Sequence, residues 1–466
     1  MTLGVVILAA GLGTRMRSKR AKVLHRAGGL ALVEHVVGAA RALAPVEKIL
    51  VVTGHQAAEV EGLLAPQGVG FVRQDPPKGT GHAIACCREA ARASMNEGQL
   101  MVLYGDTPLL SAATLLKLRE AQEESGAAAT LITTTLEDPS GYGRVIADAE
   151  NRVSAIVEHK NCDAEQLRVR VINSGIYCFR AELLWKHLSE VQPNAVSGEF
   201  YLTDMAEILV RHGHTVRALH VEDPSELLGI NTRVELADAD GILRRRKAHE
   251  LMLSGVTIER PETVSIDTQV TAGMDTVIEP FARLLGTTKI GADCRVGAGA
   301  ILESAVLADG VTIAPYTLIA DSSVDTGASV GPFARMRMGA HAGADSRIGN
   351  FVELKKTDLG AGAKSQHLAY LGDSTVGAGA NIGAGTITCN YDGEKKHRTT
   401  IGAGAFVGSN STLVAPLEIG AESYVAAGSV ITQEVPAEAL ALGRSRQVNK
   451  AGWAAARRKR KSPAGA

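Results

Sequence analysis

A six-residue period in the second half of the chain most constrains how it can fold. Aliphatic residues occupy every sixth position from 401 to 431: Ile401, Val407, Leu413, Ile419, Val425 and Ile431. The same register occurs earlier, at Ile290, Val296, Val330, Met336, Ile348, Leu354, Val376 and Ile382. An aliphatic residue at every sixth position, usually followed by Gly or Ala, is typical of hexapeptide repeats, in which each hexad supplies one short strand and one tight corner. The period predicts a left-handed parallel β-helix over residues 254–446.

The composition agrees with this prediction and excludes several classes of protein. The 466 residues include 50 glycines, more than the usual ~7%, and only 4% are aromatic, as small corners and an aliphatic interior require. The net charge of -1 argues against a dedicated nucleic-acid or membrane-surface protein. No apolar run approaches the ~18 residues of a membrane span, and no basic residue precedes the apolar segment 3–12, so we expect neither a membrane helix nor a signal peptide. Six scattered cysteines without a Cys-x-x-Cys pair favour reduced thiols in the cytoplasm.

The first half of the chain follows a different pattern. Apolar runs typical of strands, at 5–8, 49–52 and 100–104, alternate with helical patterns at 30–43 and 83–93. This alternation predicts an α/β domain with a mainly parallel, Rossmann-like sheet over residues 1–231. Residues 232–253 are expected to form a helical linker, and the basic tail 447–466 is expected to be disordered.

A glycine-rich turn directly follows the first predicted strand. Its sequence, Gly11-Leu12-Gly13-Thr14-Arg15, would let backbone N–H groups approach phosphate oxygens, and we expect the turn to open a helix. Met16 replaces the last glycine of the dinucleotide fingerprint, and no Gly-Lys-Ser/Thr completes a P-loop. Taken alone, the turn leaves a purely structural role open.

The longer run 8–16, with Lys22, resembles the signature of sugar-1-phosphate nucleotidyltransferases. The resemblance extends to later segments and implies that the following residues bind UTP or the UDP-sugar: Leu8, Ala9, Ala10, Gly11, Arg15, Lys22, Gln74, Gly79, Thr80, Tyr104, Gly105, Asp106, Gly143, Glu158, Asn173, Thr203 and Asn231. It also implies that Asp106 and Asn231 bind Mg²⁺. Arg15 and Lys22 suit the neutralisation of phosphate charge, which is most of what nucleotidyl transfer requires. Ala21 stands where that family usually has proline.

The hexad period is interrupted at two places. Residues 388–397 (TCNYDGEKKH) form a polar excursion, and residues 364–370 place His367 among small residues. Loops that leave a solenoid usually carry its function, because the coils themselves only stack.

These segments closely resemble the acetyltransferase half of the bifunctional bacterial enzymes that make UDP-N-acetylglucosamine, and the resemblance spans roughly residues 5–446. It implies that His367 is the general base, which suits an imidazole because this group titrates near neutral pH. The implied sugar-phosphate residues are Arg337, Lys355, Tyr370, Asn381 and Lys396. The implied acetyl-CoA residues are Ala384, Asn390, Tyr391, Ser409, Ala427 and Arg444. Met338 stands where the family commonly has a proline after the phosphate-binding arginine. Arg444 lies in a segment that matches the family pattern only loosely.

The resemblance implies two reactions. Glucosamine-1-phosphate is acetylated by acetyl-CoA, and the N-acetylglucosamine-1-phosphate formed then reacts with UTP to give UDP-N-acetylglucosamine, a peptidoglycan and lipopolysaccharide precursor, and pyrophosphate. It also implies a cytoplasmic homotrimer with no nucleic-acid or membrane partner. Two alternatives remain open from the residues: a nucleotidyltransferase whose β-helix only assembles subunits or binds an effector, and a non-catalytic scaffold.

Overall fold

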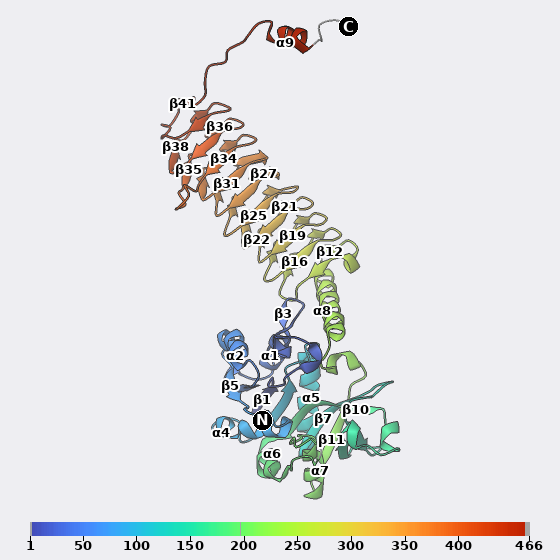
Figure 1. Cartoon of the computed structure of the whole chain (residues 1–466). Coiled ribbons are helices and arrows are strands. Elements are labelled where there is room, and N and C mark those ends of the chain that lie inside the picture. The colour runs from blue at the N-terminus through green and yellow to red at the C-terminus, as the bar shows by residue number, and fades with distance from the viewer. Residues whose placement is uncertain (1, 196, 462–466) are drawn as a thin grey trace. The chain divides into compact units, whose positions relative to one another are not determined.

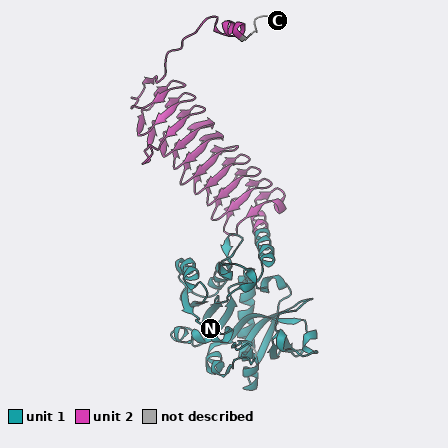
Figure 2. Cartoon of the chain, in the orientation of Figure 1, with its two compact units in different colours: residues 1–246 teal, residues 247–466 magenta. Residues whose placement is uncertain are grey.

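The computed structural model describes residues 2–195 and 197–461. The chain divides into two compact units, residues 1–246 and residues 247–466 (Figure 2).

The first unit is built on a nine-stranded mixed sheet (Figure 1). Seven strands follow one another across it in the order β11 (Val216–His220), β7 (Ala129–Thr135), β10 (Val171–Arg180), β6 (Gln99–Tyr104), β1 (Leu3–Leu8), β4 (Ile49–Thr53) and β5 (Gly70–Arg73), while β8 (Arg144–Ala147) pairs with β10 and with β9 (Val153–Val157). β1 is parallel to both β4 and β6, whereas β10 is antiparallel to β6 and β7. The predicted α/β domain with a mainly parallel sheet is confirmed.

β1 explains why the predicted strands are continuously apolar. All six of its residues are buried, and they alternate between two cores: Val6 and Leu8 belong to one, Val5 and Ile7 to the other. A strand covered on both faces needs apolar side chains at every position. The helices of this unit are α1 (Leu32–Arg41), α2 (Ala57–Leu64), α3 (Thr80–Cys86), α4 (Arg88–Ala91), α5 (Ala112–Ser125), α6 (Ala181–His187) and α7 (Asp204–Arg211), and β2 (Arg26–Ala27) pairs with β3 (Leu30–Ala31).

Two local expectations for the first unit were wrong in detail. The glycine-rich turn does not open an α-helix: Gly13 is left-handed (φ 61°), a single 3₁₀ turn follows at Thr14–Met16, and α1 begins only at Leu32. Any phosphate contact at this turn therefore depends on loop N–H groups and not on a helix terminus. The helix expected over 83–93 is instead α3 and α4, which meet at Cys87.

The second unit is a parallel β-helix made of three sheets of stacked short strands (Figure 1). The sheets run from β12 (Thr257–Ile258) to β41 (Leu440–Ala441), from β13 (Ser265–Ile266) to β40 (Val430–Ile431), and from β14 (Thr271–Ala272) to β38 (Leu417–Ile419). All fourteen aliphatic residues of the predicted register are buried in one continuous core. The hexapeptide β-helix is therefore confirmed.

One coil has three sides, so equivalent residues lie about three hexads apart, which is eighteen residues in some coils and seventeen in others. Val407 pairs with Val425, eighteen residues later. Ile382 pairs with Val407, twenty-five residues later, because the excursion at 388–397 lies between them. The strands that carry predicted site residues are β25 (Arg335–Arg337), β27 (Arg347–Asn350), β28 (Glu353–Lys355), β30 (Lys364–His367), β31 (Tyr370–Gly372), β33 (Asn381–Ile382) and β34 (Ile387–Cys389).

The expected linker helix is α8 (Arg233–Leu253), and the segment expected to be disordered contains α9 (Trp453–Lys461). Arg457 of α9 lies 5.2 Å above the Trp453 ring, a contact that favours one turn of helix. Among the described residues, no helix has the length and apolar character that crossing a membrane requires.

Candidate active sites

A cavity of about 550 Å³ lies beyond the carboxyl ends of β1 and β6, where parallel sheets usually bind their ligands. Eleven of the residues predicted to bind UTP or the UDP-sugar line it: Leu8, Ala9, Ala10, Gly11, Lys22, Gln74, Gly79, Thr80, Tyr104, Asp106 and Asn231. The lining is completed by residues to which we assigned no binding role, although the first two belong to the predicted glycine-rich turn: Leu12, Thr14, Val23, Pro77, Ala83, Glu199 and Tyr201.

A charged cluster lies on one side of this cavity. Lys22 Nζ pairs with the Asp106 carboxylate and donates to Asn231 Oδ1 at 3.1 Å, and Arg15 Nη2 donates to the same oxygen at 2.8 Å. The Lys22 and Asp106 side chains are each 14% exposed. The backbone supports this arrangement, because the Ile230 N–H donates to the Asp106 carbonyl at 2.9 Å.

The cluster has the donors that a hard divalent cation requires. Asp106 supplies a carboxylate oxygen and Asn231 an amide oxygen, and both are directed at the same ammonium group, Lys22 Nζ. Oxygen ligands of this kind suit cations such as Mg²⁺. The residues present therefore fit a divalent metal, with the cationic side chains of Arg15 and Lys22 beside it.

Gly13 allows the turn to pass close to Lys22. A Cβ built on this glycine would lie 2.7 Å from the Lys22 Cβ, and its φ of +61° is one that other residues rarely adopt. Gly13 is thus required sterically, beside the lysine that it helps to position.

The segment around Gly79 is fixed by contacts that are distant in sequence. The buried Gln74 side chain donates to the Gly79 carbonyl at 2.9 Å. The Leu202 N–H donates to Thr80 Oγ1 at 3.0 Å, and the Gly81 N–H donates to the Phe200 carbonyl at 2.8 Å. These contacts explain why residues near 200 line the cavity, although no motif there indicated it.

The remaining predicted sugar contacts form a second group. Glu158 lines a neighbouring cavity of about 250 Å³, and Tyr201 lines both cavities. Thr203 Oγ1 donates to Glu158 Oε1 at 3.4 Å, and the Asn173 N–H donates to the Gly143 carbonyl at 2.9 Å. Burial raises the pKa of the Glu158 carboxyl. Gly105 does not line the larger cavity, but its N–H donates at 2.9 Å to the carbonyl of Leu8, which does.

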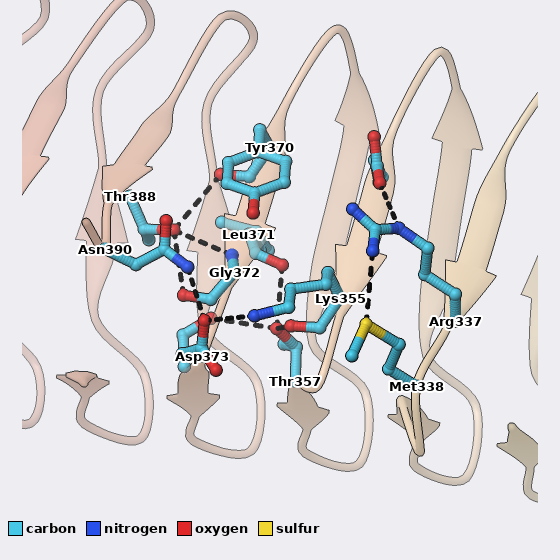
Figure 3. Close-up of polar contacts among 12 residues, drawn as sticks. Arg337, Met338, Lys355, Thr357, Tyr370, Leu371, Gly372, Asp373, Thr388 and Asn390 are labelled. Atoms are coloured by element: carbon cyan, nitrogen blue, oxygen red, sulfur yellow. Dashed lines mark hydrogen bonds and ion pairs between the residues drawn. The ribbon is translucent and has the colours of Figure 1, made fainter. Parts of the chain in front are cut away.

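In the β-helix, a buried lysine, Lys355, lies between Arg337 on one side and Tyr370 and Asn390 on the other (Figure 3). Lys355 is directly in register with Arg337 on the preceding coil, and its side chain is 5% exposed. Its Nζ lies 2.5 Å from the carboxylate of Asp373, which also accepts a hydrogen bond from Asn390 Nδ2. Arg337 Nε donates to Glu353 at 2.6 Å, and Arg337 Nη1 lies 3.2 Å from the Met338 sulfur.

Gly372 makes room for this cluster. A Cβ on it would lie 2.5 Å from the Tyr370 hydroxyl and 2.8 Å from Asn390 Nδ2. The structure therefore brings together four residues predicted for two different substrates: Arg337, Lys355, Tyr370 and Asn390.

His367 is exposed at the end of β30, which immediately precedes β31 in the chain. Its Nδ1 lies 3.0 Å from Asn350 Oδ1, and the two residues are partners in the β27–β30 pairing. An amide oxygen only accepts hydrogen bonds, so Nδ1 is the donor in this contact, and Nε2 is the ring nitrogen that can accept a proton. Asn350 was not predicted. It lies seventeen residues before His367, which is the spacing of residues stacked on consecutive coils.

The other predicted acetyltransferase residues are distributed along the last coils. Ala384, Ser409 and Ala427 stack on consecutive coils, as the Asn410 N–H to Ala384 and Gly428 N–H to Ser409 hydrogen bonds show. Tyr391 and Lys396 face each other across the excursion. Among the described residues, no hydrogen bond or ion pair connects Asn381, Lys396 or Arg444 to the Lys355 cluster.

Comparisons with known proteins agree with both halves of this description. Residues 5–168 match the MobA-like NTP transferase domain. Residues 398–433 match the bacterial transferase hexapeptide (six repeats), and residues 287–314 match the hexapeptide repeat of succinyl-transferase. Fold and sites together define a transferase that joins a nucleotidyltransferase to a hexapeptide-repeat acyltransferase.

Curated relatives narrow this class to one family. The "Bifunctional protein GlmU" of Solibacter usitatus is 55% identical and covers 98% of this chain and 98% of its own length. Those of Koribacter versatilis and Anaeromyxobacter sp. (strain Fw109-5) are 47% and 50% identical and cover 97% and 98% of this chain, and 97% and 93% of their own lengths. The chain belongs to the family of bifunctional GlmU proteins. It is therefore a bifunctional enzyme, with uridyltransferase and acetyltransferase activity, and the alternatives of a single-function nucleotidyltransferase and of a scaffold are not favoured.

Proposed function

We propose that this chain acetylates glucosamine-1-phosphate with acetyl-CoA in its β-helix and then converts the product, with UTP, into UDP-N-acetylglucosamine and pyrophosphate in its first unit. The observation that carries the proposal is the presence of two chemically distinct clusters on separate units. One combines Lys22, Asp106 and Asn231. The other combines Lys355, Asp373 and Asn390, and His367, hydrogen-bonded to Asn350, precedes Tyr370 of the same coil by three residues.

In the acetyl transfer, His367 Nε2 removes a proton from the ammonium group of the sugar. The amine attacks the thioester carbonyl of acetyl-CoA, an amide bond forms as the nitrogen loses its second proton, and the CoA sulfur takes up this proton and leaves as the thiol. Arg337 and Lys355 bind the sugar phosphate, with Tyr370, Asn381 and Lys396 as further sugar contacts. Acetyl-CoA is bound by Asn390, Tyr391, Ala384, Ser409, Ala427 and Arg444. Asn350 accepts the hydrogen bond of Nδ1, so Nε2 is the ring nitrogen that takes up the proton.

In the uridylyl transfer, a phosphate oxygen of N-acetylglucosamine-1-phosphate attacks the α-phosphate of UTP, and pyrophosphate leaves. Arg15 and Lys22 neutralise phosphate charge, and the cavity between Leu8 and Gln74 binds the nucleotide. Glu158, Asn173 and Thr203 contact the sugar. Asp106 and Asn231 would hold Mg²⁺, which supplies further charge neutralisation at the phosphates when bound.

We extend the proposal to assembly and setting. The enzyme works as a homotrimer whose acetyl-transfer sites are shared between subunits, which would supply contacts that the residues on separate sheets do not make within one chain. It acts in the cytoplasm, in agreement with six unpaired cysteines, and provides a precursor for peptidoglycan and lipopolysaccharide. In sedimentation experiments we expect three chains per particle, and a fully active monomer would contradict this assembly.

Two assays on the purified chain test the proposed reactions. The first follows thiol release from acetyl-CoA in the presence of glucosamine-1-phosphate. The second follows pyrophosphate release from UTP in the presence of N-acetylglucosamine-1-phosphate and Mg²⁺. Both signals are expected, and each should require its sugar phosphate. A folded protein that gives only one of them would contradict the proposal for the other unit.

A further inference from the structure

Asp373, to which the proposed reactions give no role, lies between Lys355 and Asn390. We call these three residues the acetyltransferase cluster. Asp373 follows β31, and its Oδ2 accepts hydrogen bonds from Lys355 Nζ and from Asn390 Nδ2 (Figure 3). The two donors lie eighteen residues before it and seventeen residues after it, on neighbouring coils. A single carboxylate oxygen thus connects the lysine proposed for the sugar phosphate with the asparagine proposed for acetyl-CoA.

Charge and burial indicate that this contact has a purpose beyond phosphate affinity. The side chains of Lys355 and Asp373 are only 5% and 12% exposed. Burial by itself would raise the pKa of the Asp373 carboxyl, but the hydrogen bonds from Lys355 and Asn390 outweigh it and lower that pKa. The ionised carboxylate offsets the charge of Lys355, which weakens the attraction of the lysine for a phosphate. Stability is also a poor explanation, since buried ion pairs contribute little compared with apolar packing.

The backbone conformation at position 373 explains why Asp is tolerated there, but not why the side chain is a charged carboxylate. Asp373 has a φ of +48°, in the left-handed region that Asp, Asn and Gly tolerate best. Asp321 occupies the same corner three coils earlier, after β22 (Leu318–Ala320), with a φ of +45°. The N–H groups of both residues donate to the carbonyl one coil back at 3.0 Å. An asparagine would adopt this backbone conformation equally well. The negative charge of Asp373 is therefore explained by the two hydrogen bonds that it accepts from Lys355 and Asn390.

We propose that Asp373 is a positioning residue for acetyl transfer: it holds Lys355 and Asn390 at a fixed separation, so that the sugar phosphate and the acetyl donor bind in reactive alignment. This inference rests on the acetyltransferase function proposed for the β-helix. Lys355 has three N–H donors, and the bond to Asp373 leaves two for phosphate oxygens. The bond also fixes the direction of the flexible lysine side chain, and a misplacement of about 1 Å can cost as much as ~100-fold in rate.

The test compares Asp373→Asn with the matched control Asp321→Asn in the full-length chain. Asp373→Asn keeps the size and the corner preference, but its amide can accept from one donor while its own N–H groups oppose the other. We expect kcat for thiol release to fall at least tenfold. We expect the KM for glucosamine-1-phosphate to stay within about threefold of the wild type, because Lys355 remains charged and is no longer neutralised. Asp321→Asn should leave both constants unchanged, and pyrophosphate release should be unchanged in both variants.

The outcomes separate this inference from the function on which it rests. Absence of thiol release from the wild-type chain would remove the proposed function itself. An active wild type with an unchanged kcat in Asp373→Asn would overturn the positioning role alone, as would equal losses in Asp321→Asn or a rise in KM with kcat retained. If Asp373→Asn does not fold, Asn390→Ala serves as the second variant. It removes the amide donor and keeps the ion pair between Lys355 and Asp373, and a kcat equal to wild type there would also overturn the role.

Discussion

Replacing Asp106 by Ala tests the proposed uridylyl-transfer site most directly. The substitution removes the carboxylate that pairs with Lys22 Nζ and one of the two oxygen donors proposed for Mg²⁺. It leaves Asn231 bonded to both Arg15 and Lys22, so the cluster loses its negative charge but keeps its two cations. We therefore expect a loss of activity much larger than the loss of stability.

The expected losses of activity and of stability can both be estimated from the contacts of Asp106. Charge stabilisation by a bound metal is worth several kcal/mol, and about 4 kcal/mol corresponds to roughly a thousandfold in rate. Breaking a buried ion pair costs about 3–5 kcal/mol because one charge remains unpaired. Lys22 keeps its hydrogen bond to Asn231 and is 14% exposed, so we expect a smaller cost, about 1–3 kcal/mol of unfolding free energy.

The assay measures pyrophosphate release and thiol release on the same Asp106→Ala preparation. Pyrophosphate release should fall about a thousandfold or more, while thiol release should stay within about twofold of the wild type, because the acetyltransferase cluster lies in a separate unit. Thiol release thus serves as an internal control for folding. Pyrophosphate release within tenfold of wild type would refute the role of Asp106, and loss of both activities in a folded protein would refute the two-site model.

Three further predictions concern the catalytic base, the pH dependence of stability and the domain limits. His367→Ala should abolish thiol release and leave pyrophosphate release intact. Asn350→Ala should lower thiol release about tenfold to a hundredfold, because the imidazole loses its orientation. Equal activity of Asn350→Ala and wild type would show that the contact is unnecessary. Burial, with repulsion from nearby carboxylates, raises the pKa of Asp204 to about 6. The stability that the protonated side chain contributes is therefore complete below about pH 4 and is lost as the pH rises through 6. The melting temperature of Asp204→Asn should rise relative to that of the wild type between pH 4.5 and 7, and a pH-independent difference would contradict this. A chain ending at Arg246 should fold and keep uridylyl transfer without acetyl transfer, since residues 1–246 form one compact unit and Arg246 donates a hydrogen bond to the Leu109 carbonyl within it. An inactive or insoluble fragment would show that the proposed limits of domain 1–231 and linker 232–253 are wrong.

The sequence was sufficient to predict what depends on local periodicity. In the β-helix each repeat contacts only its neighbours, so a regular six-residue spacing identifies the inward positions, and all fourteen predicted positions are buried. In the first unit, continuous apolar runs identified β1, β4 and β6, because strands covered on both faces need apolar side chains throughout.

Chemical motifs also predicted much of the first cavity, because most of its residues lie in short segments that follow strands. Glu199 and Tyr201 were missed for the opposite reason. Glu199 and Tyr201 line the cavity only because hydrogen bonds from Gly81 and Leu202 join that segment to the one at 79–82, and no local pattern marks such a contact.

The tertiary structure alone decided which polar side chains became partners. Lys22 meets Asn231 across 209 positions, a separation that no sequence spacing encodes. In the β-helix, Asn390 meets Asp373 and His367 meets Asn350 because the coils stack in a particular register. The hexad period determines which residues point inward, but outward side chains become neighbours only through that stacking. The excursion at 388–397 makes its coil longer than eighteen residues, so its partners cannot be found by counting sixes, and they follow only from the hydrogen bonds between coils.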